Sequence, residues 1–257
     1  MTLLYLVAGE ASGDVLGGRL MAALRARRRD LTFAGIGGPR MAEQGLASLF
    51  PMDELSLMGL AEVLPKLRGL ARRMAEAEAD VLARHPAALV TIDAPSFTLR
   101  LAGRVRPKGV RVIHYVAPQV WAWRQGRVRK IARRVDRLLA LLPFEPPFFE
   151  AAGIPTTFVG HPVLESGADR GDAARFRAAH GLDPATKLLA VMPGSRGGEL
   201  ARHLPIFTRA IALLRQRFTT LGVVIPTLPR LVDAVRTAPW PVAPIVTAET
   251  GDKHDAW

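Results

Sequence analysis

Several turns in this sequence place charged and polar side chains directly after short apolar runs, which is where open α/β proteins hold their ligands. The first is rich in glycine and contains Gly9, Glu10, Ser12, Gly13 and Asp14. Such a turn between a strand and a helix points backbone N–H groups toward an anionic ligand. It matches neither the dinucleotide fingerprint nor the phosphate-loop pattern, which disfavours a dehydrogenase or a P-loop kinase. The alternative is structural: Ser12 caps a helix and the glycines permit close packing.

A lone carboxylate ends another apolar run. Asp93 follows Leu-Val-Thr-Ile and stands two residues before Pro95, which biases the intervening residue away from helix. This order predicts a carboxylate at the C-terminal end of a parallel strand, where it can act as a general base on a sugar hydroxyl. An Asp that caps a helix over 96–105 fits the same residues equally well.

A third segment combines aromatic and basic side chains. Gln119, Trp121 and Trp123 follow an apolar run over 110–116, and six Arg and Lys residues lie between 124 and 134. Rings beside cations suit single-stranded nucleic acid, and they equally suit a sugar and phosphate pocket. Two core indoles followed by a solvated helix face would give the same pattern.

A second glycine-rich turn carries a fixed positive charge. Gly194, Ser195, Arg196 and Glu199 lie between an apolar run and a helical pattern. Backbone amides over 194–198 together with the Arg196 guanidinium predict a diphosphate site. A plain strand-to-helix turn does not explain an Arg between glycines, so we favour anion binding here.

Residues 57–74 form a cationic amphipathic pattern. Apolar residues recur at helical spacing at 60, 63, 64, 67, 70 and 74, with cations at 66, 68, 72 and 73. This pattern is typical of an interfacial helix on anionic lipid, with Leu60, Val63, Leu64 and Leu67 as the contact residues. A core-facing helix of an α/β domain has the same period.

The elements that must position these side chains alternate along the chain. Strands are predicted at 3–8, 31–36, 87–93, 110–116, 137–142, 156–159, 187–192, 221–226 and 242–246, with helices between most of them. This alternation predicts a parallel sheet with helices on both faces. The polar, turn-rich stretch 160–172 divides the chain into domains at 1–165 and 166–257. The second has too few strands for a doubly wound domain, so we expect a small appendage or a truncated chain.

Composition narrows the function classes. Of 35 basic residues 30 are Arg, and the net charge is +12. That bias suits anionic ligands, although a genome rich in G and C gives it too. The sequence has no Cys, no Asp-X-Asp, no His pair at metal spacing and no nucleophile elbow, so we expect no metal and no cofactor. Without a basic leader or a bilayer-long apolar run, a cytoplasmic protein is expected, soluble or attached to a membrane surface.

Taken together, these segments resemble the lipid-A-disaccharide synthase family of bacterial glycosyltransferases. The resemblance rests on AGEASGD at 8–14, GIGGPRM at 35–41, MGLAEVLPKL at 58–67, IDAPSF at 92–97, HYVAPQVWAWRQGRVRKI at 114–131, LPFE at 142–145, GHP at 160–162 and PGSRGGE at 193–199. It implies an α/β fold with two Rossmann-like domains in the GT-B arrangement. Residues 1–165 would form the acceptor-side domain and 166–257 part of the donor-nucleotide domain.

The resemblance also implies a reaction. UDP-2,3-diacylglucosamine would donate its sugar to 2,3-diacylglucosamine 1-phosphate with inversion, giving the lipid A disaccharide phosphate and UDP. Asp93 matches the family's essential carboxylate, a candidate base, and Arg196 matches the Arg that stabilises the UDP leaving group.

Further roles follow from the same matches. The first turn would shape the sugar site, Gln119 and Trp121 would face it, and Gly194, Ser195 and Glu199 would belong to the donor loop. The 58–67 segment would contact the cytoplasmic leaflet of the inner membrane, where the protein would be peripheral. No nucleic-acid partner is expected, and a homo-oligomer is left open.

The chain departs from the family at its C-terminal end, since family members continue into a segment that holds uracil and ribose. We therefore expect this 257-residue form to be inactive by itself. Two rival readings stay open: another GT-B or nucleotide-sugar enzyme, such as a peptidoglycan-lipid transferase or an epimerase, and a non-enzymatic basic module that binds nucleic acid.

Overall fold

The computed structural model describes the chain except for residues 56–59, 124, 166, 249–253 and 257, and it leaves out the side chains of 60–68, 123 and 168. The chain divides into two compact units, unit 1 at Met1–Pro162 and unit 2 at Val163–Trp257. Each unit is an α/β body with its own sheet.

Unit 1 is built on a parallel sheet of six described strands in the order β2-β1-β3-β4-β5-β6. Every neighbouring pair is parallel. The central strand β3 is buried along its whole length, as its continuous apolar sequence requires of a strand covered on both faces. The strands are β1 Thr2–Ala8, β2 Leu31–Ile36, β3 Ala88–Ile92, β4 Val112–Tyr115, β5 Arg137–Ala140 and β6 Thr156–Phe158.

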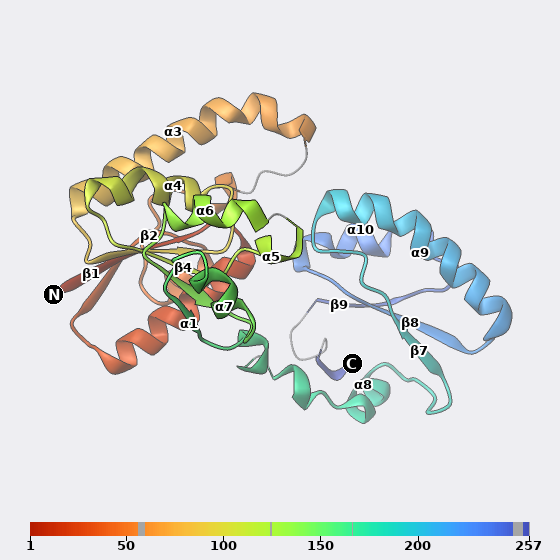
Figure 1. The fold of residues 1–257 in the computed structure, drawn as a ribbon. Coiled ribbons are helices and arrows are strands. Elements are labelled where there is room, and N and C mark those ends of the chain that lie inside the picture. The colour runs from red at the N-terminus through yellow and green to blue at the C-terminus, as the bar shows by residue number, and fades with distance from the viewer. Residues whose placement is uncertain (56–59, 124, 166, 249–253, 257) are drawn as a thin grey trace. The chain divides into compact units, whose positions relative to one another are not determined.

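Helices cover both faces of this sheet, as the alternation predicted. Figure 1 shows α3, α4 and α6 on one face and α1 and α7 on the other. The helices are α1 Ala11–Arg27, α2 Pro39–Glu43, α3 Leu60–Arg84, α4 Thr98–Val105, α5 Val120–Trp123, α6 Val128–Ala132 and α7 Glu145–Glu150. Short 3-10 helices lie at Met52–Leu55, Arg106–Lys108, Gln125–Arg127 and, at the border with unit 2, Pro162–Glu165.

The strand order fixes where a ligand crevice can open. The chain passes from β1 to β2 on one side and then crosses to β3 on the other side of β1. At such a switch point the loops after the two adjacent strands diverge and leave a crevice at their carboxyl ends. Here those loops begin at Gly9 and at Asp93, so the topology brings the first turn and the lone carboxylate to one place.

Unit 2 contains a smaller parallel sheet in the order β7-β8-β9 among the described residues. The strands are β7 Lys187–Ala190, β8 Leu221–Pro226 and β9 Ile245–Thr247. The helices are α8 Ala173–Ala179, α9 Gly197–Arg217 and α10 Val232–Arg236, with 3-10 helices at Ala168–Arg170 and Pro229–Leu231. The main core cluster is small: Val191, Leu200, Ile211, Val223, Ile225, Leu231 and Val235.

Within the described ranges, no helix has the length and apolar character needed to cross a bilayer.

Candidate functional site

Ser12 and Asp93 meet at the switch point of unit 1. The Ser12 hydroxyl donates a hydrogen bond to Asp93 Oδ2 over 3.0 Å. Neither side chain caps a helix: α1 has Glu10 at its N-cap and α4 has Phe97, both without a side-chain capping bond. The two capping alternatives are therefore wrong, because each side chain bonds across 81 residues of sequence to the other.

The backbone around Asp93 is strained. Asp93 has φ +50°, Ala94 has φ +42° and Val116, after the neighbouring strand, has φ +76°. Non-glycine residues in this region cost about 1–3 kcal/mol each and persist only where the surrounding structure holds them. Gly9 is required beside this strained turn, because a Cβ at position 9 would come within 2.8 Å of the Ala94 Cβ. The strained turn aims the carboxylate out of the sheet.

A pocket of about 300 Å³ lies at the carboxyl ends of β3, β4 and β5. Asp93 lines it together with exposed Gln119 and with His161 of the GHP motif, so the structure brings these three residues together. Its other lining residues are Pro95, Val116, Ala117, Pro118, Leu141, Leu142 and Glu145. The pocket thus combines the Asp93 carboxylate at a strained turn with a second carboxylate, Glu145, and with amide, imidazole and apolar surface.

Glu145 holds the segment that contains Trp121 in place. This carboxylate is 2% exposed and accepts hydrogen bonds from Trp121 Nε1 at 3.2 Å and from the backbone amides of Leu141 and Leu142 at 3.1 and 2.9 Å. The Trp121 ring meets Phe144 edge-on, with centroids 4.8 Å apart. Trp121 is therefore half-buried and fixed in orientation. The sequence assigned no role to Glu145, although it ends the LPFE motif.

Asp14 supports the first turn from behind. It is buried, and its oxygens accept hydrogen bonds from the amides of Gly38, Arg40 and Met41 at 2.8, 2.9 and 3.0 Å. Gly13 is also buried, and a Cβ there would lie 3.2 Å from the carbonyl oxygen of Ile92. Both residues fix the position of the turn, while Glu10 is half-buried at its start.

His114 lies on β4 beneath this site. It is fully buried, and Nδ1 is 2.8 Å from the Thr91 hydroxyl on β3. Nε2 has no hydrogen-bond partner within the described part of the chain. Burial lowers the pKa of His114 to about 4, because the imidazolium would be charged in an apolar interior. The side chain is therefore neutral near pH 7.

In unit 2 an internal carboxylate organises the PGSR turn. Glu199, in the first turn of α9, accepts the Ser195 amide at 3.1 Å and pairs with Arg196 at 3.1 Å. These contacts, the Ser195 amide first, hold the pKa of Glu199 below its usual range. Gly194 has φ +123°, and a Cβ there would come within 2.8 Å of Glu199. The turn is thus folded around a negative charge at a helix N-terminus.

Two residues that the sequence did not single out hold the ends of this turn. His203 donates from Nδ1 to the Pro193 carbonyl at 2.7 Å, and Arg230 donates to the Ser195 carbonyl at 3.0 Å. Neither lies in a motif, so only the fold of α9 and the segment after β8 brings them to the turn.

The remaining predicted residues lie outside the described side chains. Leu60, Val63, Leu64 and Leu67 begin α3, whose backbone is described as helix there. Membrane contact by these residues stays a prediction.

The sequence model of the family described as lipid-A-disaccharide synthetase matches residues 4–239. The chain belongs to this family. Among curated synthases, it is 56% identical to that of Rhodospirillum centenum over 260 residues and 51% identical to that of Granulibacter bethesdensis over 257 residues. Each alignment covers 99% of this chain and 65% of the relative, so the chain spans less than two thirds of their length.

Solved structures share the fold at low sequence identity. The S. aureus MnaA–UDP co-structure superposes with a TM-score of 0.68 at 12% identity and covers 99% of this chain and 71% of that one. A UDP-GlcNAc 2-epimerase from Neisseria meningitidis, bound to UDP-GlcNAc, gives 0.66 at 10% identity over 100% and 74% of the two chains. The α/β fold class predicted for this synthetase-family chain is confirmed.

Proposed function

We propose that this chain supplies the acceptor side and the phosphate-binding turn of an inverting glycosyltransferase. The enzyme joins UDP-2,3-diacylglucosamine to 2,3-diacylglucosamine 1-phosphate and releases UDP. The observation that carries the proposal is the Ser12–Asp93 contact at the switch point, in a chain that belongs to the lipid-A-disaccharide synthetase family.

Asp93 is the general base in this proposal. Inversion needs one displacement: the acceptor 6-hydroxyl oxygen forms a bond to the anomeric carbon while the bond from that carbon to the UDP oxygen breaks. The hydroxyl proton passes to Asp93, and the electron pair of the broken bond leaves with UDP. Ser12 holds one carboxylate oxygen and the strained turn fixes its direction, which suits a base that must meet a single hydroxyl.

In this proposal, unit 2 stabilises the negative charge that develops on the UDP leaving group. Arg196 and the backbone amides at the N-terminus of α9 form a positive group that suits a diphosphate. Glu199 keeps this turn folded before the donor binds, and it must yield some of its contacts when a phosphate arrives. UDP and UDP-GlcNAc, which are bound in the two solved structures of the same fold, support a uridine diphosphate donor.

The protein is also proposed to lie peripherally on the cytoplasmic leaflet, because both sugars carry acyl chains. The apolar residues at the start of α3 are the proposed contact. Replacing Val63, Leu64 and Leu67 with Ser should raise the fraction recovered without detergent. Unfolding of that variant would instead show that these residues belong to the core.

The deciding experiment uses a chimera in which residues 1–257 are followed by the part of the Rhodospirillum centenum synthase beyond the matched region. With radiolabelled acceptor, the chimera should form disaccharide, and the 257 residues alone should form none. A folded chimera that is inactive where the R. centenum synthase is active would contradict the proposal. Interconversion of UDP-GlcNAc at C2 would favour the epimerase reading.

A further inference from the structure

The GHP motif at 160–162 connects two distant parts of unit 1. It leaves β6 at the edge of the sheet, where the Val159 amide still bonds a carbonyl of β5 at 2.9 Å. At its other end, Arg19 of α1 donates from Nη1 to the Pro162 carbonyl at 2.9 Å, across 143 residues of sequence. Gly160 permits the change of direction, because its φ of +83° lies in the region that favours glycine. The motif therefore returns from the sheet edge to α1.

Helix α1 also holds the carboxylate side of the site. Ser12 and Arg19 are seven residues apart, so they lie on one face of this helix and about 10 Å apart along its axis. Ser12 bonds Asp93, and Arg19 bonds Pro162. One helix face thus fixes both the Asp93 loop and the GHP motif, and His161 of that motif lines the Asp93 pocket.

His161 differs in charge from the rest of this pocket. Among the described residues that line it, only His161 can become a cation, whereas Asp93 and Glu145 are carboxylates and the others carry no charge. A second cation is close in the chain contacts, because Arg19 bonds the carbonyl of the next residue, Pro162. The Arg19 side chain is exposed, and no ion pair joins it to a carboxylate in the part of the chain that the structure describes.

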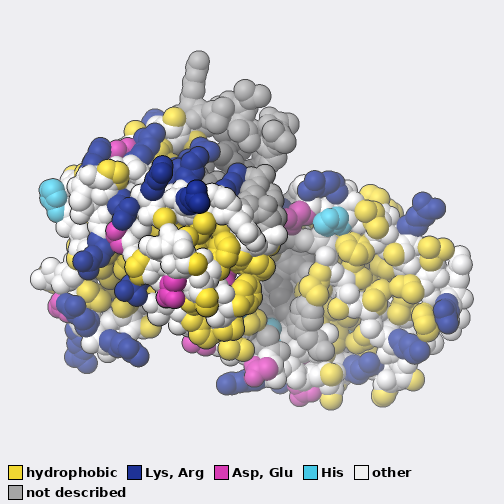
Figure 2. Space-filling model, in the orientation of Figure 1, with side chains coloured by type: hydrophobic (Ala, Val, Ile, Leu, Met, Phe, Trp, Pro, Cys, Tyr) yellow, Lys and Arg dark blue, Asp and Glu magenta, His cyan; other side chains and the backbone are white. Residues whose placement is uncertain are grey.

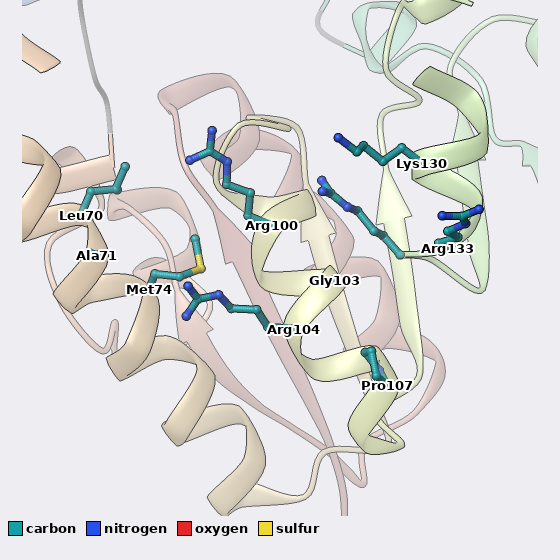
Figure 3. Close-up of a pocket in the computed structure, with 10 residues that line it drawn as sticks. Leu70, Ala71, Met74, Arg100, Gly103, Arg104, Pro107, Lys130 and Arg133 are labelled. Carbon is teal, nitrogen blue, oxygen red and sulfur yellow. The ribbon is translucent and has the colours of Figure 1, made fainter. Parts of the chain in front are cut away.

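A larger pocket of unit 1 has the opposite composition. Its volume is about 670 Å³, and it has no carboxylate among its described lining residues but several cations: Arg100, Arg104, Lys130, Arg133 and Arg134. Figure 2 shows Lys and Arg side chains gathered over this part of unit 1, and Figure 3 shows Arg104 and Lys130 reaching toward the pocket from different helices. The Asp93 pocket presents one cationic position among carboxylates. A ligand with a single anionic group can therefore enter the Asp93 pocket in one orientation only.

The acceptor named in the proposed function has this distribution of charge. It carries one phosphate on C1 and an uncharged hydroxyl on C6. The two carboxylates of the pocket repel a phosphate. An imidazole donates an N–H whether it is neutral or protonated, and a phosphate oxygen accepts it in a charge-assisted hydrogen bond. With the phosphate at His161, the neutral 6-hydroxyl is the group left to meet Asp93.

We propose that His161 binds the 1-phosphate of the acceptor sugar and that Arg19 is a positioning residue, which holds the GHP motif for this contact. The proposal rests on the proposed function and deepens it, because it states which group of the acceptor each side of the pocket recognises. His161 is a specificity-determining residue in this scheme. It selects a phosphorylated sugar and directs the 6-hydroxyl toward the base.

The test is titration of the 257-residue chain with N-acetylglucosamine 1-phosphate and with N-acetylglucosamine, followed by NMR. The parent chain should bind the phosphorylated sugar more tightly. His161→Asn should weaken its binding roughly tenfold or more, because a charge-assisted hydrogen bond is lost, and should leave binding of N-acetylglucosamine unchanged. The matched control His85→Asn removes an exposed histidine that precedes β3, at the opposite end of that strand, and should change neither affinity.

A lysine at position 161 separates recognition of charge from a structural role. His161→Lys restores a cation, so this variant should prefer the phosphorylated sugar as the parent chain does. Equal binding of the two sugars by the parent chain, or loss of both sugars in His161→Asn, would overturn the proposal. Arg19→Gln should lose less affinity for the phosphorylated sugar than His161→Asn, and Arg27→Gln, at an exposed position of the same helix, should lose none. Parent-like binding in Arg19→Gln would contradict its positioning role.

A second arm separates the phosphate of the acceptor from the diphosphate of the donor. In the chimera, His161→Asn should raise the KM for the acceptor roughly tenfold and lower kcat by less, while calorimetry should show unchanged UDP affinity. Weaker UDP binding, with binding of N-acetylglucosamine 1-phosphate unchanged, would assign His161 to the donor and overturn the proposal. An inactive chimera would contradict the proposed function, whereas the sugar titrations need no turnover and still decide the role of His161.

Discussion

The two units hold their functional turns in different ways. In unit 1 the groups that fix the site are buried in a large core: Asp14 is 3% exposed and Glu145 is 2% exposed. In unit 2 the corresponding carboxylate, Glu199, has 27% of its side chain exposed, and its partner Arg196 has 46%. Both turns follow parallel strands and both are organised by a carboxylate, so the difference lies in burial.

The hydrophobic cores of the two units differ in the same way, since apolar side chains are less well buried in unit 2. Ile206 and Leu213 on α9 are 64% and 60% exposed, and Figure 2 shows apolar side chains over much of the visible face of unit 2. A large core can maintain the strained φ angles at Asp93, Ala94 and Val116. Unit 1 is thus built to hold a fixed geometry, whereas the turn in unit 2 is held by accessible contacts that a ligand can replace.

The largest expected effect separates the chemistry assigned to unit 1 from the donor binding assigned to unit 2. In the chimera, Asp93→Asn should lower turnover roughly 100- to 10,000-fold, because the variant removes the proposed general base. UDP affinity, measured by calorimetry, should stay unchanged. An exposed carboxylate, Asp53, provides the control as Asp53→Asn. Wild-type turnover in the Asp93 variant would exclude this residue as the base.

The second prediction concerns pH and the buried His114. Its pKa in the folded state, about 4, lies below the value of about 6.5 for an exposed imidazole, so only the unfolded chain binds this proton between those values. The free energy of unfolding of unit 1 should therefore fall by up to about 3 kcal/mol as pH drops from 6.5 to 4. Urea titrations at several pH values measure this.

The variant His114→Gln cannot titrate and isolates that contribution. Its pH dependence over the same interval should be flatter than that of the parent chain by the amount predicted. Parallel curves for the two chains would mean that His114 binds its proton equally in the folded and the unfolded states, and would contradict the lowered pKa.

The third prediction compares the two organising carboxylates directly. Glu145→Gln places an amide N–H₂ group where backbone and indole N–H groups need an acceptor, and it should destabilise unit 1 by about 2 kcal/mol. Glu199→Gln should leave the stability of unit 2 unchanged within measurement, because water can reach its contacts. Urea unfolding, followed by Trp fluorescence and circular dichroism, checks both. Equal losses of stability in the two variants would show that the carboxylates of the two units do not differ in the way that their burial predicts.

The smallest expected effect is a difference in hydrogen exchange. Backbone amides of β1 and β3 should exchange at least about tenfold more slowly than those of β7, since local opening of a small core costs less. Mass spectrometry of the 257-residue chain after timed labelling measures this. Protection of β7 equal to that of β3 would show that unit 2 is as stable as unit 1.

Much of the fold follows from local patterns. The strand at 31–36 and the strand at 221–226 have the predicted bounds, and the other predicted strands are found with ends that differ by one to three residues. Apolar runs between turns that contain Gly or Pro specify buried strands. Both signals, the spacing of apolar residues and the backbone preferences of Gly and Pro, act over only a few residues. After the strand at 221–226, the chain forms a 3-10 turn at Pro229–Leu231 and then the short α10, since Pro229 sets a tight start.

Local patterns along the chain are therefore enough to specify the strand-end position of Asp93, the glycine-rich turns and the family. Three contacts arise only when the chain folds: the Ser12 hydroxyl bonds Asp93 rather than capping α1, Glu145 fixes Trp121, and Arg230 holds the PGSR turn. These pairs lie 81, 24 and 35 residues apart. Their contacts depend on strand order and helix packing, which are set by burial over the whole unit, and no short window of sequence contains that information.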